Sequence, residues 1–352
     1  MSKFDFYLNN FSKNKRQIAN FSYRYAKDYF RNNFAVFDIK VGIELEFYLT
    51  SSEKFKKKHH YTPIIQHDRL KLSADQFATA KYQRDAIGQY AIDESAIEES
   101  AIEKFIWQCN SDPIISSLGK IKKEQGVNQL EYSSLPYQDL LKLCTDLDKI
   151  KKQLNALSKK HNFKLIFKAF TSLDDCPSSL QFNISYVDQN GNNVLKNSPL
   201  LQELTYTNLL DKTNHILFIL APSELDYYRY HKEVNKNLFS KGKYNSPVNL
   251  SVGINNRSCA VRIPNYKIDD EYRIEYRVAS SDSNHWLALS AILLSLCSVG
   301  SAKNKYPLIY GNAFDENYNY LTDIFQNIDI AKDYFFDINN NIFKQFLKFC
   351  SN

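Results

Sequence analysis

The stretch Arg273-Ile-Glu-Tyr-Arg277 carries a charged side chain at every second position, with an apolar or aromatic residue between. Four other short runs alternate acids, amides or hydroxyls with apolar residues in the same way, at residues 44–46, 129–131, 181–185 and 249–251. Successive side chains of a β-strand point to opposite faces, so the apolar set of each run can face a core and the polar set an open cavity. The polar set consists largely of groups that hold divalent cations and phosphates, which predicts a sheet with a functional face.

Amphipathic helices and further strands surround these runs. The spacing of apolar residues predicts helices at residues 12–33, 95–107, 137–160 and 200–220. An apolar helix is predicted to begin after Ser283 or Asn284, either of which can cap it. Additional strands are predicted at residues 164–170, 180–186 and within 248–277, and the aromatic-rich C-terminal tail is predicted to be helical.

This order of elements indicates the domain organisation. The chain has no internal repeat and no convincing linker. Residues 1–40 form a helical N-terminal segment that is too small to be a domain, and residues 41–352 form one domain. The fold class expected for that domain is α+β, with a mostly antiparallel sheet and flanking helices.

Composition excludes membrane-spanning and secreted classes. The chain of 352 residues is 43% hydrophobic and 24% charged, which is ordinary for a soluble globular protein. Its longest apolar stretch, residues 286–297, falls short of the ~20 residues that cross a bilayer. The polar N-terminus lacks the apolar stretch of a signal peptide. We therefore expect a cytoplasmic protein with no membrane partner.

The cysteines and the basic residues point to no special partner. The 6 cysteines are scattered without a C-x-x-C pair, so we expect buried thiols and no zinc site. The net charge of +6 is mild, and residues 54–60 form the densest basic run. That run is either a nucleic-acid patch or a solvated loop. No aromatic stacking pattern accompanies it, so we favour the loop and expect no nucleic-acid partner.

The acidic residues of the alternating runs suggest a metal site. Carboxylates on one face of a sheet repel one another and persist together mainly when cations neutralise them. The candidates are Glu44, Glu46, Glu124, Glu131 and Glu275. If these side chains converge, their oxygens suit Mg²⁺ or Mn²⁺.

The arginines suggest what such a site could do. Arginine presents a planar donor fork that matches carboxylates and phosphates. The candidates are Arg229, Arg257, Arg262, Arg273 and Arg277. Metals and arginines around one cavity suit phosphoryl transfer, in which positioning and charge neutralisation carry most of the catalysis. The alternative is an ordinary sheet whose charged solvent face pairs Glu with Arg across strands.

Five segments, taken in order, resemble the catalytic domain of glutamine synthetases. Residues 42–47 look like the family's G-x-E-x-E-F strand, and residues 124–131 are similar to its E-x(4)-Q-x-E element. Residues 256–264 match N-R-S-x-x-x-R-[IV]-P, residues 273–277 match R-[IV]-E-x-R, and residues 284–287 resemble the N-P-Y-L that follows. The resemblance runs from about residue 41 to residue 300 and implies that family's curved, mostly antiparallel sheet.

The resemblance implies ATP as co-substrate and two or three Mg²⁺ or Mn²⁺ ions. One set of metal ligands would be Glu46, Glu124 and Glu131. The second set, at the ion that bridges the nucleotide phosphates, would be Glu44, Glu275 and, where the family has a histidine, Gln181.

The resemblance also implies roles for the remaining polar residues. Arg257 and Arg273 would contact the ATP phosphates, and Asn183 and Ser185 would lie near the nucleotide. Arg262 would neutralise the transferred phosphoryl group, which makes Arg262 and Arg257 the catalytic candidates. Arg277 and Arg229 would bind the carboxylate of the amino-acid substrate.

The chain departs from the family pattern at several places. Cys176-Pro-Ser-Ser179 replaces the N-G-S-G loop, which removes two glycines and, at Pro177, an N–H donor. Asn245 replaces the flap glutamate that closes over ammonium, and an insertion at about residues 230–241 precedes it. The small N-terminal β-grasp domain is missing from this pattern. We therefore expect a different acid or amine, and a monomer or an oligomer smaller than a dodecamer.

Two functions follow from these observations. The first is an ATP-dependent carboxylate–amine ligase that forms an acyl phosphate, with glutamate as the default acid and ammonia or another amine as the acceptor. The second is a catalytically impaired, nucleotide-binding protein with a regulatory role. Glutamate–cysteine ligases are a further alternative, because they share the general fold and the way in which metals are bound. The N-R-S and R-I-E-x-R segments fit the glutamine synthetase pattern better.

Overall fold

The computed structural model describes residues 3–52, 97–298 and 306–350. The basic run at residues 54–60 lies outside these ranges. The described residues form an eight-stranded sheet in the order β2-β3-β1-β5-β8-β7-β6, with β4 paired to β1. The strands are β1 (Asp38–Ser51), β2 (Gly119–Lys123), β3 (Gln129–Ser134), β4 (Phe163–Ile166), β5 (Leu180–Val187), β6 (Val252–Ile254), β7 (Val261–Ile263) and β8 (Ile274–Tyr276).

The sheet is open and mostly antiparallel, as predicted. Among the described strands, β6 and β7 pair in parallel and the other pairs are antiparallel. The long strand β1 lies between β3 and β5. The apolar members of its alternation, Ile43, Leu45 and Phe47, are buried in the core.

The register of the strands decides which polar side chains face one another. Glu46 of β1 lies opposite Glu131 of β3, and Glu44 lies opposite Gln181 of β5. On the other side of β5, Asn183 lies opposite Glu275 of β8. Directly opposite residues point to the same face of a sheet, so period two in each strand becomes one continuous polar face.

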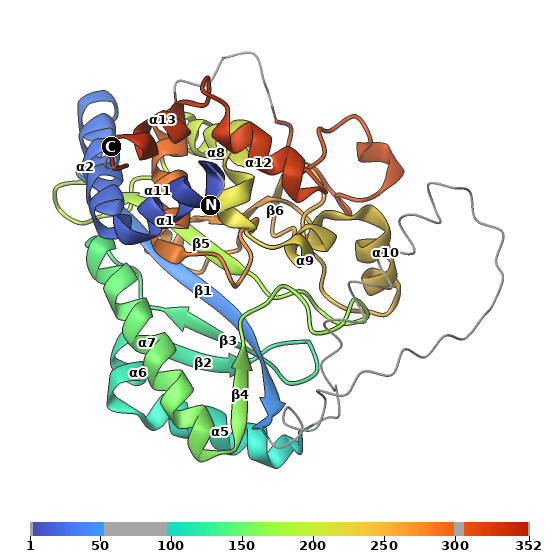
Figure 1. The fold of residues 1–352 in the computed structure, drawn as a ribbon. Helices are drawn as coiled ribbons and strands as arrows, with labels where there is room; N and C mark the ends of the chain where they lie inside the picture. The colour runs from blue at the N-terminus through green and yellow to red at the C-terminus, as the bar shows by residue number, and fades with distance from the viewer. Residues whose placement is uncertain (1–2, 53–96, 299–305, 351–352) are drawn as a thin grey trace.

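Two groups of helices pack against the sheet and share one hydrophobic core with it. They are α1 (Lys3–Lys13), α2 (Lys15–Asn33), α5 (Glu99–Ser111), α6 (Pro113–Leu118), α7 (Leu140–Lys160), α8 (Pro199–Leu220), α9 (Glu224–Tyr227), α10 (Lys232–Ser240), α11 (His285–Leu296), α12 (Ile328–Phe336) and α13 (Asn341–Leu347). Figure 1 shows α5, α6 and α7 beside β2, β3 and β4, whereas α2, α8 and α11 gather on the other side of β1. None of the described helices is long and apolar enough to cross a membrane.

Helix α11 lies at the centre of the group that it forms with α2 and α8. All of its residues are buried, and it packs against α2 and α8. Asn284 caps it, because its side-chain oxygen accepts hydrogen bonds from the main-chain N–H groups of Trp286 at 3.1 Å and Leu287 at 3.4 Å. The prediction of an apolar helix after residue 283 or 284 is therefore confirmed, with Asn284 as the cap.

The N-terminal helices differ from the prediction. The single helix expected at residues 12–33 is two helices that break at Asn14, whose side-chain amide donates to the main-chain oxygen of Phe349 at 2.7 Å. Both helices share the main core: Phe11 packs on Phe346, and Phe30 on Tyr186. We propose that residues 1–40 extend the domain at residues 41–352 and do not fold as a separate unit.

Other boundaries move by a few residues. The helix expected at residues 95–107 is α5, which ends at Ser111, and the strand expected at residues 164–170 is β4, which ends at Ile166. The C-terminal tail contains α12 and α13, as predicted. All 6 cysteines are free, and all but the half-buried Cys350 are buried.

Candidate functional site

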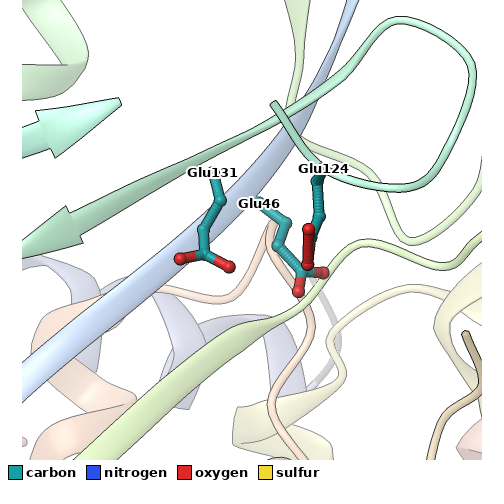
Figure 2. A group of neighbouring side chains, drawn as sticks. All are labelled: Glu46, Glu124 and Glu131. Carbon is teal, nitrogen blue, oxygen red and sulfur yellow. The ribbon is translucent and has the colours of Figure 1, made fainter. Parts of the chain in front are cut away.

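Three carboxylates converge where β1, β3 and the loop after β2 meet. Figure 2 shows Glu46, Glu124 and Glu131, whose ligand oxygens all lie within 4.8 Å of one another. Glu46 and Glu131 are brought together by the register of β1 and β3. Glu124 follows β2 directly, where its main-chain N–H donates to the oxygen of Gln129 at 2.9 Å. We call these three residues the carboxylate triad.

The triad carries more negative charge than its surroundings neutralise. Burial, and then repulsion by Glu131 and Glu124, raises the pKa of Glu46 to about 8. Burial and Glu131 also raise the pKa of Glu124. Lys122 forms an ion pair with the triad, its Nζ lying 3.0 Å from Glu131 Oε1. Arg257 and Arg277 also favour the ionised form of Glu124, but they do not offset the rise in its pKa. Three clustered carboxylates with an unmet need for positive charge fit a hard divalent cation such as Mg²⁺ or Mn²⁺.

Neighbouring groups orient the triad, and of these the sequence analysis selected Gln181 as a metal ligand but gave no role to Ser133. Glu46 accepts hydrogen bonds from the main-chain N–H of Ser179 at 2.7 Å and from Gln181 Nε2 at 2.9 Å. Ser133 Oγ donates to Glu131 Oε1 at 2.6 Å. Ser133 follows Glu131 by two positions, so continuing the period-two alternation along the strand could have found it.

A second polar group lies beside the triad, on β5, β7 and β8. Glu275 is buried between two arginines: Arg262 Nη1 lies 2.9 Å from Oε2, and Arg277 Nη1 contacts Oε1. Burial opposes ionisation, but Arg277 and Arg262 hold the pKa of Glu275 below its usual value. Arg277 Nη1 also donates to Gln181 Oε1 at 2.9 Å.

Glu44 belongs to the same group but has less compensation. Its Oε1 accepts a hydrogen bond from Asn183 Nδ2 at 3.1 Å. Burial, followed by repulsion from Glu131 and Glu275, raises the pKa of Glu44 to about 7. The structure thus brings all six predicted metal-ligating residues together, but Gln181 and Glu275 are already bonded to arginine.

A cavity of about 520 Å³ opens beside Glu44 and is lined by Asn183, Ser185 and Arg273, three of the four residues predicted to bind ATP. Arg273 Nε donates to Asn183 Oδ1 at 2.9 Å, which holds the guanidinium at the cavity wall. We call this space the nucleotide-side cavity. The fourth predicted residue, Arg257, is not among its lining residues.

A small cavity of about 20 Å³ lies at the triad itself. Its lining includes Glu46 and Glu124 together with Arg257, Arg277 and Arg229. The two arginines predicted to bind the substrate carboxylate, Arg277 and Arg229, therefore line one space with two members of the triad. Arg229 is 1% exposed, and its guanidinium donates to the main-chain oxygens of Val278 at 2.8 Å and Arg277 at 3.2 Å.

A larger cavity of about 530 Å³ continues outward from the small one. Tyr244, Asn245 and Arg257 line both spaces. The Arg257 guanidinium stacks 4.6 Å over the ring of Tyr244. Part of the insertion expected at residues 230–241 is helix α10, which supplies Phe239 to the wall. We call this space the outer cavity.

The sequence matches the family described as glutamine synthetase, catalytic domain, over residues 16–319. The gamma-glutamylputrescine synthetase PuuA of Escherichia coli (strain K12) is 28% identical over 201 residues, which are 55% of this chain and 40% of PuuA. The match thus spans less than half the length of that relative.

Solved structures agree on the fold. The structure described as apo GmaS without ligand aligns with a TM-score of 0.63 at 15% sequence identity, and it covers 95% of this chain and 71% of GmaS. At that identity the likeness shows a common fold alone. The predicted α+β fold is thereby confirmed.

Proposed function

This chain belongs to the glutamine synthetase family, and we propose that it is an ATP-dependent ligase that joins the side-chain carboxylate of an amino acid, with glutamate as the default, to an amine. The observation that carries the proposal is the carboxylate triad, of which Glu46 and Glu124 line the small cavity together with Arg257 and Arg277. Glu44, two positions before Glu46 on β1, lines the nucleotide-side cavity. The name of PuuA supports a γ-glutamyl product.

The residues of the chain fit successive parts of this reaction. A Mg²⁺ or Mn²⁺ ion held by the triad would supply Lewis-acid neutralisation of phosphate charge. Asn183, Ser185 and Arg273 bind ATP in the nucleotide-side cavity, and Arg277 faces the substrate acid from the small cavity. The carboxylate oxygen attacks the γ-phosphorus and ADP leaves, which forms the acyl phosphate.

The second half of the reaction uses the outer cavity. An amine that enters past Tyr244 and Arg257 attacks the acyl carbon, loses a proton and expels inorganic phosphate. Arg257 is exposed where the small and outer cavities meet, so it can neutralise the departing phosphate. Arg262 contributes through Glu275, to which it is ion-paired at 2.9 Å.

The residues that line the outer cavity indicate which kind of amine it would accept. PuuA is named for putrescine, a diamine whose second ammonium is best neutralised by a carboxylate when it is buried. Of the described residues that line this cavity, none is Asp or Glu, whereas amides and the rings of Tyr244, Tyr310 and Phe239 are present. This lining supports an amine with an uncharged apolar or aromatic body.

A nucleotide-binding protein with a regulatory role is the second candidate. Asn245 favours it, because this buried amide lines both the small and the outer cavity at the position where the family resemblance places a catalytic glutamate. An amide does not accept a proton at neutral pH, so the incoming amine would have to lose its proton by another route.

The deciding experiment is γ-glutamyl hydroxamate formation from glutamate, hydroxylamine and Mg-ATP. Hydroxylamine is a reactive nucleophile that needs little help from an ammonium site. We expect product from the natural protein and none from Glu131→Gln, whereas Glu103→Gln on exposed α5 retains activity. A folded protein that binds ATP but forms no product with any amino acid would establish the second candidate.

A further inference from the structure

We propose that the amine used by this site is an arylamine, in which the attacking nitrogen is bonded directly to an aromatic ring and is uncharged at neutral pH. The inference rests on the proposed function, because it names the second substrate of that same site. Two features of the chain carry it. One is the set of groups that face the incoming nitrogen where the small and outer cavities meet, and the other is the aromatic wall of the outer cavity.

The groups at the junction of the two cavities do not remove a proton from an ammonium. Tyr244, Asn245 and Arg257 line both cavities, so the amine passes them on its way to the acyl carbon. Asn245 is 9% exposed, and its side-chain amide makes no hydrogen bond to the residues that the structure describes. An amide oxygen accepts a hydrogen bond from an uncharged N–H but takes up no proton at neutral pH. The guanidinium of Arg257 is always protonated and repels an ammonium.

The carboxylates of this region have other partners. Glu46 and Glu124 line the small cavity, and both belong to the triad that would hold the divalent cation. Asp175 forms an ion pair with Lys243 at 2.7 Å, and its other oxygen accepts from the main-chain N–H of Val127 at 2.8 Å. The described residues that line the outer cavity include no Asp or Glu. A neutral amine needs no proton removed before it attacks, so it fits these surroundings and an ammonium does not.

The reaction of an arylamine balances without a base from the protein. The nitrogen lone pair is free at neutral pH, because the ring withdraws electron density and leaves the nitrogen too weakly basic to be protonated. The lone pair forms the bond to the acyl carbon, and the bond from that carbon to the phosphate oxygen breaks. The new amide nitrogen gives its extra proton to the departing phosphate, whose charge Arg257 neutralises.

The wall of the outer cavity suits an aromatic ring. Four large apolar side chains line it and stay exposed, namely Phe239, Tyr244, Ile254 and Tyr310. The ring of Phe239 packs on that of Phe314, with the two centroids 5.6 Å apart, so its position is supported from behind. The volume of about 530 Å³ is more than ammonia or hydroxylamine fills. An arylamine would bury this apolar surface and pack against the rings.

The test compares amines with the natural protein, Mg-ATP and the amino acid that supports hydroxamate formation, by mass spectrometry of the amide and by phosphate release. Aniline is aromatic and neutral, benzylamine is aromatic and charged, and cyclohexylamine is aliphatic and charged. At neutral pH we expect kcat/KM for aniline to exceed that for benzylamine by about a hundredfold, which is what a missing general base costs. Benzylamine should exceed cyclohexylamine severalfold. Between pH 7 and pH 9, kcat/KM should rise for benzylamine and stay level for aniline.

Two variants separate the two features. Asn245→Glu places a carboxylate at the junction and should raise kcat/KM for benzylamine by at least about tenfold, a larger factor than for aniline. Phe239→Ala removes part of the wall and should lower kcat/KM for aniline by about tenfold, a larger factor than for hydroxylamine. The matched control is Trp107→Ala, an exposed ring on α5, which should change neither rate.

The outcomes separate this inference from the proposed function. Hydroxamate without an anilide, or a higher kcat/KM for benzylamine or cyclohexylamine than for aniline, would overturn the arylamine assignment and leave the ligase proposal standing. Neither hydroxamate nor anilide with any amino acid would overturn the ligase itself, and the arylamine with it. If a variant does not fold, the comparison of amines with the natural protein still decides the question.

Discussion

Arg229 Nη2 donates a hydrogen bond to the main-chain oxygen of Arg277 at 3.2 Å, and Arg229 Nη1 donates to the next carbonyl, that of Val278, at 2.8 Å. Both arginines line the small cavity beside the triad. One arginine therefore supports the main chain that carries the other. This contact links the 3-10 helix Tyr228–Tyr230, which follows α9, to the residues directly after β8.

Replacing Arg229 should cost stability first. In Arg229→Met the buried carbonyl of Arg277 loses its donor and that of Val278 keeps only the hydroxyl of Tyr230, and we expect the free energy of unfolding to fall by about 2–4 kcal/mol. Urea unfolding followed by circular dichroism measures this. Arg24→Met, on the exposed face of α2, is the matched control and should change it by less than about 0.5 kcal/mol. Unchanged stability with a raised KM for glutamate would instead assign Arg229 directly to the substrate.

Metal binding should stabilise the folded protein through the triad. A cation that binds only the native state adds about 2.7 kcal/mol at a concentration 100 times its Kd. We expect Mn²⁺ to raise the Tm of the natural protein and of Glu103→Gln, and to leave Glu124→Gln nearly unchanged. Differential scanning calorimetry with and without EDTA measures the shift. Equal Mn²⁺ stabilisation of all three proteins would place the ion elsewhere.

The nucleotide-side cavity should depend on Arg273. Removing a charge-assisted hydrogen bond to phosphate costs about 1.5–3 kcal/mol, so Arg273→Ala should weaken ATP binding by about tenfold to a hundredfold. Isothermal titration with a non-hydrolysable ATP analogue reports the Kd. Lys120→Ala, an exposed cation on β2, should bind the analogue normally. Normal affinity in Arg273→Ala would exclude this cavity as the phosphate site.

Asp226 should make stability depend on pH. It is fully buried, accepts from Ser280 Oγ at 2.6 Å, and has a pKa raised to about 7 by burial and by Asp282. The native state keeps a proton that the unfolded state releases, so the stability that this group contributes in acid is lost as pH rises towards 7.

Asp226→Asn removes that titration. Between pH 5 and pH 7, we expect the Tm of the variant to rise relative to that of the natural protein. The corresponding difference in the free energy of unfolding should grow by up to about 1.4 kcal/mol per pH unit. The matched exchange at Asp333, exposed on α12, provides the baseline. A constant difference across this range would mean that Asp226 is ionised in the folded protein.

The amine preference should follow the charge of the outer cavity. We expect a higher kcat/KM for butylamine than for putrescine, measured by phosphate release with glutamate and Mg-ATP. Asn312→Asp places a carboxylate in the lining and should shift the ratio several-fold towards putrescine. A preference for putrescine in the natural protein would show that a group outside this lining binds its second ammonium.

The alternation of residues predicted the polar face of the sheet well. Side chains of a strand alternate between faces by geometry, so the polar members of residues 44–46, 129–131 and 181–185 had to share a face once those segments paired. The helices α7, α8 and α11 were predicted for a similar reason, because their apolar residues are enough to select a helix. The break at Asn14 was missed, since its partner Phe349 lies 335 positions away.

The partner of each polar group was decided only by the tertiary structure. The sequence placed Glu46, Glu124 and Glu131 in one candidate site, and strand register brought their oxygens together. It also offered Gln181 as a metal ligand, but the amide faces Arg277, which is 96 positions away. Period two determines the face on which a side chain lies, whereas hydrogen bonds within that face depend on register and on side-chain reach across strands, and these exist only once the sheet has formed.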